Sequence, residues 1–171
     1  MGMLELGALV RNICSQAQPL AEAKSIDLTC CKSSEDFLIP GNDLAIRRLV
    51  LVLLDNALKY SPAGGSVSVE LSRKDDLVLL EVSDTGPGIA EVEMASIFDR
   101  FYRTSEARAR VQAGSGLGLS LAAGIAQRHG ARIHVETEEG RGSRFQVSFP
   151  AFANTQKPGL VSPDAERSHV S

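Results

Sequence analysis

The chain has 171 residues, which is enough for one domain with a core and a tail but too few for two full domains. Aliphatic residues dominate, and a formal net charge of −3 gives no indication of a nucleic-acid partner. Three cysteines, at positions 14, 30 and 31, form neither a disulfide framework nor a zinc-binding spacing, and no apolar run approaches the ~20 residues of a membrane span. We therefore expect a soluble chain in a reduced, intracellular setting.

Periodicity predicts these elements in chain order: a helix over 6–24, strands over 26–31 and 36–39, a helix over 43–60, strands over 66–74 and 76–84, a short helix over 90–102, a helix over about 117–128, and strands over 131–138 and 143–149. Pro19 should kink the first helix or end it early. Asn42 or Asp43 can cap the second helix, and Gly130 stops the last one. Residues 104–116 have no apolar periodicity and predict a mobile loop.

The order of these elements predicts the class of fold. Hairpins and helices are mixed without a repeated strand–helix–strand alternation, and the sequence contains no internal repeat. This order favours an α/β (α+β) two-layer sandwich, with helices on one face of a mixed, largely antiparallel sheet. We expect this domain to cover residues 4–150. The polar, proline-bearing segment 151–171 predicts a disordered tail.

Three glycines at alternate positions, Gly114, Gly116 and Gly118, precede the last predicted helix. Glycine inside a helix costs ~0.5–1 kcal/mol relative to alanine, so a string of glycines at a helix start suggests a purpose. Free N–H groups at a helix N-terminus can bind phosphate. The spacing fits neither a P-loop, which needs a Lys-Ser or Lys-Thr pair after its last glycine, nor the GxGxxG dinucleotide fingerprint. Taken alone, the segment is equally compatible with a structural turn.

A second glycine-bearing segment, SDTGPGI over residues 83–89, follows the second strand of the central predicted hairpin. Gly, Pro and Asp are ordinary turn residues, so an isolated segment of this kind is usually a turn. The functional alternative is that Asp84 accepts a hydrogen bond from the exocyclic amine of adenine, while Gly86 and Gly88 admit the flat ring. A buried acceptor there would select ATP over GTP, because guanine carries a carbonyl at the corresponding position.

The apolar helix predicted over 43–60 carries polar residues that need an explanation. Positions 52, 56, 59 and 60 share one face, which brings Asn56, Lys59 and Tyr60 together. Asn56 either satisfies a neighbouring carbonyl group or supplies an oxygen to a phosphate-bound Mg²⁺, a hard ion that favours oxygen ligands and keeps several waters. In the second case Lys59 would act as a point charge for phosphate.

Four segments together resemble the ATP-binding catalytic domain of sensor histidine kinases, in the ATPase superfamily shared with DNA gyrase and the heat-shock chaperones. LLDNALKYSP resembles the N box, SDTGPGI the first glycine box, IFDRFYR the F box and GSGLGLSLA the second glycine box, in the family's order. The resemblance runs from about Leu4 to Phe149. It implies a five-stranded sheet with three main helices, and it implies ATP and Mg²⁺ as cofactors.

The resemblance also implies roles for individual residues. Asn56 would bind Mg²⁺ and Asp84 would accept a hydrogen bond from adenine. Lys59 and Arg103 would contact phosphate and, with Asn56, carry the catalysis. The remaining residues implied to contact or flank the nucleotide are Tyr60, Gly86, Gly88, Gly114, Ser115, Gly116, Leu117 and Gly118.

The segment 103–116 resembles the family's ATP lid. On closure of the lid, Arg108 or Arg110 could reach the γ-phosphate. Phe98 and Phe101 are expected to be hydrophobic anchors for the lid rather than ligands of the nucleotide.

The chain departs from the family pattern at Val52. The family's N box often carries another Asn four residues before Asn56, and ATP-hydrolysing relatives place a Glu at that point to activate water. Valine cannot act as a general base, so we expect slow hydrolysis, while transfer to a nucleophile supplied from elsewhere stays possible. The Mg²⁺ shell would also rely more on water.

A second departure concerns the phospho-acceptor, which histidine kinases carry on a separate helical dimerisation domain. None of His129, His134 and His169 has the acceptor context. We interpret the chain, which starts with Met1-Gly2, as an excised catalytic domain rather than a natural stand-alone module.

The expected reaction is in-line transfer of the γ-phosphoryl group of Mg-ATP to a histidine on the dimerisation domain of the same parent kinase. This places the chain in two-component signal transduction, with a response-regulator receiver downstream. The alternatives are a non-catalytic nucleotide-sensing switch and a serine kinase of the same superfamily that acts on a regulatory partner. The fragment would be monomeric and cytoplasmic, without a nucleic-acid partner, and its parent a homodimer that can be anchored in the inner membrane.

Overall fold

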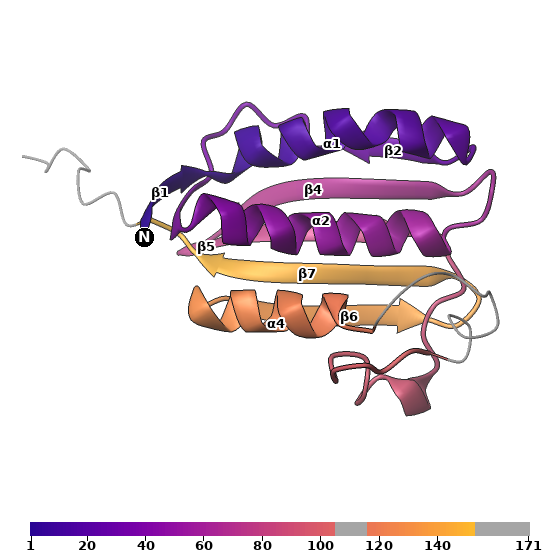
Figure 1. Cartoon of the computed structure of the whole chain (residues 1–171). Helices are drawn as coiled ribbons and strands as arrows, with labels where there is room; N and C mark the ends of the chain where they lie inside the picture. Colours follow the sequence, from indigo (N-terminus) through magenta and orange to yellow (C-terminus); the bar gives the residue numbers. More distant parts are fainter. Residues whose placement is uncertain (105–115, 153–171) are drawn as a thin grey trace, which may run out of the picture.

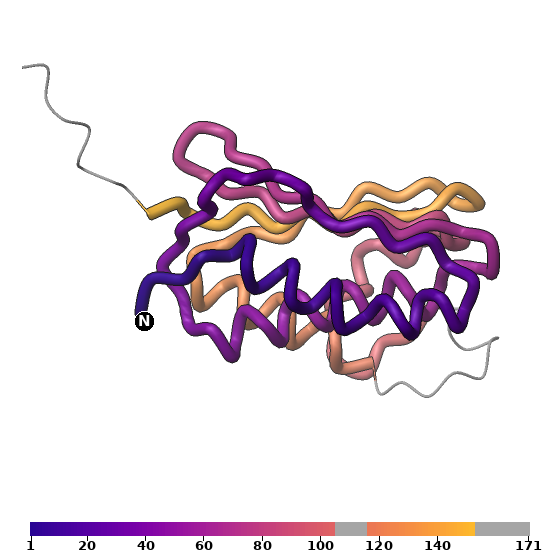
Figure 2. The backbone as a smooth tube through the Cα atoms, turned by 90° about the horizontal axis from the view of Figure 1, so that it is seen from above, coloured from indigo at the N-terminus to yellow at the C-terminus, as the bar shows by residue number. Residues whose placement is uncertain are grey.

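Three helices pack on one face of a five-stranded sheet in the computed structural model of the chain, which describes residues 1–104 and 116–152 (Figures 1 and 2). The helices are α1 (Leu6–Ala23), α2 (Asp43–Tyr60) and α4 (Gly118–Arg128). The sheet has the order β2 (Asp27–Cys30), β4 (Ser66–Lys74), β5 (Leu77–Asp84), β7 (Gly142–Pro150) and β6 (Arg132–Glu138). A two-stranded sheet pairs β1 (Gly2–Glu5) with β3 (Leu38–Gly41). The predicted two-layer sandwich is therefore confirmed.

The five-stranded sheet is mixed but largely antiparallel, as the sequence predicted. β2 runs parallel to β4, whereas the pairs β4–β5, β5–β7 and β6–β7 are antiparallel. The register of β5 with its two neighbours places Asp84, the last residue of β5, opposite Val67 on one side and Ser143 on the other. The end of β5 is therefore held by a strand on each side.

The core lies between the three helices and the sheet. On β4 and β5 buried residues alternate with more exposed ones, as expected for a sheet with one covered face. On α2 the buried residues recur every three or four positions, which is the spacing of one helix face: Ile46, Leu49, Val50, Leu53, Leu54, Ala57 and Leu58. In the described part of the chain, none of the helices has the combination of length and apolar character needed to cross a bilayer.

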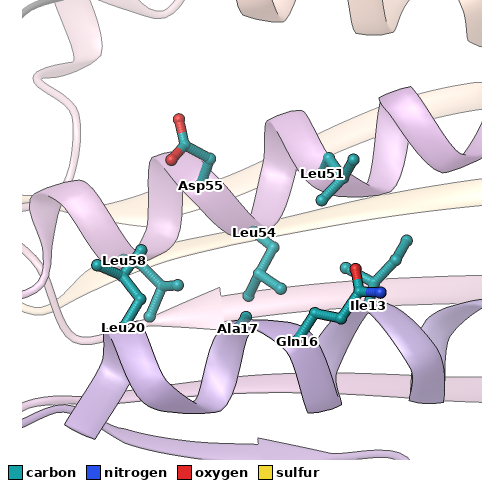
Figure 3. Close-up of a pocket in the computed structure, with 8 residues that line it drawn as sticks. All are labelled: Ile13, Gln16, Ala17, Leu20, Leu51, Leu54, Asp55 and Leu58. Carbon is teal, nitrogen blue, oxygen red and sulfur yellow. The ribbon is translucent and has the colours of Figure 1, made fainter. Parts of the chain in front are cut away.

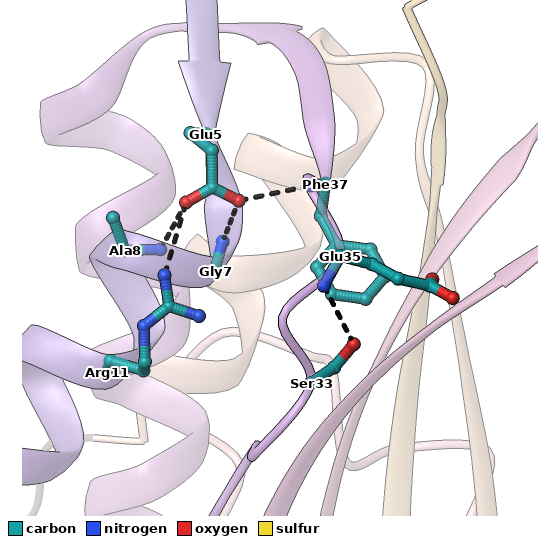
Figure 4. A network of polar contacts seen from close by, with 7 residues as sticks. All are labelled: Glu5, Gly7, Ala8, Arg11, Ser33, Glu35 and Phe37. Carbon is teal, nitrogen blue, oxygen red and sulfur yellow. Dashed lines mark hydrogen bonds and ion pairs between the residues drawn. The ribbon is translucent and has the colours of Figure 1, made fainter.

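Side chains cap the N-termini of α1 and α2. The Asn42 side chain accepts a hydrogen bond from the Ala45 amide at 3.0 Å, so Asn42 rather than Asp43 is the cap of α2. At the start of α1, the Glu5 carboxylate accepts hydrogen bonds from the first amides of the helix and from the Phe37 amide at 3.0 Å (Figure 4). Burial raises the pKa of Glu5, but the backbone N–H groups outweigh it and hold the pKa below its ordinary value.

The buried His129 joins the end of α4 to the start of α2. Its Nδ1 donates to the carbonyl oxygen of Ile125 at 2.7 Å, and its Nε2 accepts from the Asn42 amide at 3.1 Å. An imidazole that donates through one nitrogen and accepts through the other is neutral. His129 therefore fixes two helix ends relative to each other as an uncharged group.

Two predicted features of the helices differ from the structure. Of the two effects expected of Pro19, an early end is wrong because α1 continues to Ala23, and a kink stays a prediction. Pro19 is exposed and lies in the last part of the helix, so the backbone hydrogen bond that it cannot make leaves a carbonyl group open to water. The helix predicted over 90–102 is only a 3₁₀ turn at Glu91–Glu93 followed by further turns, because the backbone bonds that follow also join residues three apart.

Candidate functional site

The C-terminal half of α2 carries the polar residues that the sequence singled out. Asn56, Lys59 and Tyr60 are half-buried, as is Val52 one turn before Asn56. Lys59 Nζ lies 2.9 Å from Asp55 Oδ2, an ion pair between residues four apart on the helix. Such a partly exposed pair contributes only ~0–1 kcal/mol, so exchanging it for a phosphate contact would cost little free energy.

The loop after β5 packs against the end of α2. Asp84 Oδ1 accepts a hydrogen bond from the Gly86 amide at 2.9 Å. A Cβ atom on Gly86 would stand 2.9 Å from that oxygen and 2.9 Å from the carbonyl oxygen of Tyr60. Only glycine fits this close approach, which brings the Asp84 carboxylate next to the end of the helix that carries Asn56.

Asp84 lies in a poorly hydrated position. Burial raises the pKa of its carboxyl group above the ordinary value, although the backbone amides of Gly86 and Ser143 act in the opposite direction. A buried carboxylate costs free energy unless hydrogen-bond donors reach it. This environment suits an acceptor for a ligand's amine, which is the role predicted for Asp84.

The turn between β6 and β7 supports the same loop from the other side. Gly88 has a φ of +72°, and a Cβ atom there would collide with the carbonyl group of Glu138. Gly142 has a φ of +124°, and a Cβ atom there would collide with the carbonyl oxygen of Asp84. Gly88 therefore has a packing role, and its predicted contact with the base stays a prediction.

Two hydroxyl side chains beside Asp84 were missed by the sequence analysis. The Thr137 hydroxyl on β6 accepts a hydrogen bond from the Ile89 amide at 2.8 Å and lies 3.0 Å from the Ser143 hydroxyl on β7. The available signal was Gly142, because a second glycine in the hairpin turn indicates a close backbone approach. That signal could not identify the segment that approaches.

The start of α4 meets the middle of α2. A Cβ atom on Gly118, the first residue of α4, would lie 3.3 Å from Val52 Cγ1. Gly116 has a φ of +70°, and its carbonyl oxygen accepts from the Phe101 amide at 2.9 Å. Backbone conformation and close packing therefore require glycine at 116, whereas a side chain at 118 would need a small shift of Val52; Leu117 between them is half-buried. Four residues expected at the phosphates or in the lid lie outside the described residues: Arg108, Arg110, Gly114 and Ser115.

The F-box segment is only partly as predicted. Phe98 packs against the core, as expected of a hydrophobic anchor. Phe101 is 67% exposed, with the Arg100 guanidinium 5.7 Å from its ring centroid; the lid residues that it was expected to anchor lie outside the described residues, so that role stays a prediction. Phe101 has a φ of +65°, and its amide donates to the carbonyl oxygen of Gly116 at 2.9 Å. Arg103 is half-buried just before the part that the structure leaves undescribed.

The oxygen ligands that the described residues offer near α2 fit a metal ion that is bound mainly through phosphates and water. Within residues 1–104 and 116–152, no group of three or more His, Cys, Asp or Glu side chains could hold a metal ion. Asn56 offers a neutral amide oxygen at the half-buried edge of α2. Mg²⁺ commonly keeps several waters and takes one or two protein oxygens together with substrate phosphates.

A separate apolar groove lies between α1 and α2 (Figure 3). Its floor includes the buried side chains of Ile13, Leu54 and Leu58, and its rim includes the half-exposed Leu20 and Leu51. None of the residues that line it is among those predicted to bind nucleotide. The groove is therefore distinct from the site formed by α2, α4 and the loop after β5.

Comparisons with known proteins show the family to which the chain belongs. Residues 41–153 match the family described as "Histidine kinase-, DNA gyrase B-, and HSP90-like ATPase". The chain is 38% identical over 148 residues to the sensor histidine kinase RppB of Synechocystis sp., a match that covers 86% of this chain and 33% of RppB. The chain thus spans about a third of that relative's length.

Two solved structures have a similar fold. The mycobacterial sensor histidine kinase MprB superposes with a TM-score of 0.77 at 27% identity, covering 88% of this chain and 98% of that one. Full-length ShkA in complex with AMPPNP gives a TM-score of 0.75 at 27% identity, covering 88% of this chain and 31% of ShkA. The chain therefore belongs to the histidine kinase-, DNA gyrase B- and HSP90-like ATPase family, among relatives that are sensor histidine kinases.

Proposed function

We propose that this chain binds Mg-ATP and transfers its γ-phosphoryl group to a histidine on a separate dimerisation domain of the same parent protein. One observation supports this proposal above the others. Gly86 packs against the end of α2 and Gly118 against its middle, so the loop that carries Asp84 and the N-terminus of α4 border the same stretch of α2 as Asn56. An adenine acceptor, an oxygen ligand and helix N–H groups for phosphate are the parts that a Mg-ATP site needs.

In the bound state, Asp84 would accept a hydrogen bond from the exocyclic amine of adenine, and Tyr60 would flank the nucleotide. AMPPNP is the ligand of the similar protein ShkA, and it contains the same base. The backbone at Gly116 and Gly118 would lie near the phosphates, where an N-terminal helix dipole favours negative charge. Discrimination against guanine follows from the mismatch at Asp84.

Asn56 would hold Mg²⁺ through its amide oxygen, and the bound ion would neutralise charge on the β- and γ-phosphates. Lys59 would exchange its pairing with Asp55 for a phosphate oxygen, and Arg103 would contribute a second positive charge. Catalysis of phosphoryl transfer is mostly positioning and charge neutralisation, so this set needs no strong protein base.

The nucleophile must come from outside the described residues. Both ring nitrogens of the buried His129 are engaged, by Ile125 and by Asn42. His134 is exposed on β6 and lies 3.6 Å from Glu136, on the strand face that alternates away from the core. A neutral imidazole of the partner domain would attack the γ-phosphorus as the bond to the bridging oxygen breaks, and ADP would leave.

Val52 favours transfer over hydrolysis. At this position an apolar side chain packs against the start of α4 and offers no group that could activate water. The response-regulator receiver, as the later acceptor of the phosphoryl group, belongs to the same proposal.

The test mixes this chain with γ-labelled ATP, Mg²⁺ and a separately produced histidine-containing dimerisation domain. Acid-labile, base-stable phosphate on that domain is expected, and it should vanish when the acceptor histidine is replaced by alanine. Tight ATP binding without transfer would instead establish the nucleotide-sensing switch. Acid-stable, base-labile phosphate would establish a serine kinase.

A further inference from the structure

Three cysteines that the proposed transfer does not use lie together between α1 and β2. Cys14 is on α1 and is 2% exposed, Cys30 is the half-buried last residue of β2, and Cys31 follows it and is 8% exposed. All three are free thiols. Their proximity is a product of the fold, because the helix and the strand bring together residues that are distant in the sequence.

The packing of α1 on β2 explains why the Cys14 and Cys30 thiols meet. The Gln18 side-chain amide donates to the carbonyl oxygen of Leu28 at 2.9 Å, which fixes the helix against the strand. Cys14 lies four residues before Gln18, which is about 6 Å along the helix axis. Cys30 lies two residues after Leu28, which is about 6.6 Å along the strand. Because α1 and β2 run in opposite directions, these two steps lead the same way, so Cys14 and Cys30 lie opposite each other along the same helix–strand contact.

The two thiols differ in chemical character. The hydrogen bond from Cys14 lowers the pKa of Cys30 to about 7; burial opposes this shift, whereas the Cys31 amide and the nearby Arg11 reinforce it. The same contact, together with burial, raises the pKa of Cys14. Cys30 is also the most accessible of the three. One thiol is thus suited to attack a reagent and the other to remain protonated beside it.

We propose that Cys14 and Cys30 form a site of reversible oxidation, at which hydrogen peroxide produces a disulfide that joins α1 to β2. The Cys30 thiolate attacks a peroxide oxygen, the O–O bond breaks, and Cys30 becomes a sulfenic acid as hydroxide leaves. The Cys14 sulfur then attacks the Cys30 sulfur, the S–O bond breaks, and water leaves with the Cys14 proton. Two thiols lose two electrons to one peroxide, and the second water forms from the released hydroxide and a proton.

Cys31 is not the partner in this reaction. Consecutive Cα atoms are about 3.8 Å apart across a trans peptide, below the roughly 4.4–6.8 Å that disulfides usually span. No cis peptide bond is present in the described residues. β2 ends at Cys30 and an irregular segment follows, so strand pairing does not hold the chain beyond Cys30.

The test treats the reduced chain with hydrogen peroxide, denatures it, and labels the remaining thiols with an alkylating agent. We expect one label on the oxidised chain instead of three, restored to three by dithiothreitol. Trypsin should release a cross-linked pair made of residues 12–24 and 25–32. Because the second peptide contains both Cys30 and Cys31, the variant Cys31→Ser is the matched control, and it should still cross-link.

The variants Cys14→Ser and Cys30→Ser should both lose the cross-link while keeping the circular dichroism of the folded chain. In Cys14→Ser a dimedone-type probe should trap a sulfenic acid at Cys30, and in Cys30→Ser it should trap none. A cross-link that disappears in Cys31→Ser would overturn the assignment, as would three free thiols on the folded chain after peroxide treatment. Neither result depends on whether the chain transfers phosphate.

Discussion

Replacing Asp84 by asparagine tests the predicted contact with adenine. The two residues have nearly the same shape, so the end of β5 and its pairing with Val67 and Ser143 should persist. What changes is the number of acceptor atoms. The carboxylate has two acceptor oxygens, whereas the amide has one oxygen and one NH₂ group that can only donate.

The magnitude follows from the donors that already surround Asp84. The Gly86 amide donates to Oδ1 at 2.9 Å, and the Ser143 amide also donates toward the carboxylate. An adenine amine adds a further donor, so in Asp84→Asn at least one donor faces the NH₂ group. Loss of a hydrogen bond to a charged group costs ~1.5–3 kcal/mol, which weakens ATP binding by about 10- to 150-fold.

Isothermal calorimetry with ATP and with ADP measures this change. Glu81→Gln is the matched control, because Glu81 is a carboxylate on the same strand that pairs with Arg144 on the face away from the helices. Its affinity for both nucleotides should equal that of the unmodified chain.

Stability separates a lost ligand contact from a damaged fold. Burial raises the pKa of Asp84, so in the folded state the ionised carboxylate is disfavoured at neutral pH. Asp84→Asn removes that penalty, and the urea midpoint at pH 7 should therefore not fall. As the pH decreases through the folded-state pKa, the carboxyl group of the unmodified chain also becomes neutral. The difference in urea midpoint between the unmodified chain and Asp84→Asn should therefore narrow. Unchanged affinity for ATP in a folded Asp84→Asn variant would refute the adenine contact.

Other predictions concern the metal, the glycine loop and the helix ends. Asn56→Leu should lower the affinity for Mg-ATP toward the value measured in EDTA, and an undiminished effect of Mg²⁺ in calorimetry would count against the metal role. Gly86→Ala should lower the free energy of unfolding by ~1–3 kcal/mol, because the added Cβ atom would overpack the loop. Gly124→Ala is the control: there is open space around Gly124, so alanine should raise the free energy of unfolding by ~0.5–1 kcal/mol. Urea denaturation in which Gly86→Ala is the more stable variant would contradict the packing argument. His129→Ala should cost ~2–4 kcal/mol in the same assay, through a cavity and an unpaired amide at the start of α2, and a change below ~1 kcal/mol would show that the ring is dispensable. Glu5→Gln should lower the free energy of unfolding by ~1 kcal/mol at pH 7. Because the folded-state pKa of Glu5 is lowered, the difference in unfolding free energy between the two chains should be complete above pH 4.5 and shrink as the pH falls below that value. A difference that stays constant down to acid pH would contradict the capping role.

Local patterns were sufficient to predict most of the fold. The strands β4 and β5 were recognisable because buried and exposed side chains alternate along them, and α2 because its apolar residues follow a helical period. The prediction of a helix over 90–102 was wrong for a physical reason. Its apolar residues fit a helical period, but Val92 is 89% exposed and the chain bends in successive turns of three residues.

The candidate site was predictable where a residue type is unusual for its place, and not where it depends on distant packing. Asp84 was identifiable because a carboxylate and two glycines end an apolar strand. Thr137 was not, because an ordinary threonine in an edge strand gives no sign that it holds the Ile89 amide. The exposure of Phe101 was not predictable either, because its hydrophobicity favours burial, whereas the structure leaves it 67% exposed at a positive φ.

Val52 connects the packing of the fold to the chemistry that we propose for it. Its Cγ1 atom is 3.3 Å from the point where Gly118 would carry a Cβ atom, so an apolar side chain that cannot activate water also supports the start of α4. Introducing a glutamate at position 52 would therefore add volume and charge to a contact that is already tight at 118. Efficient ATP hydrolysis would need a water-activating group at position 52 and room for that group beside the start of α4. Bound ATP in this chain should accordingly persist until a nucleophile arrives from another domain.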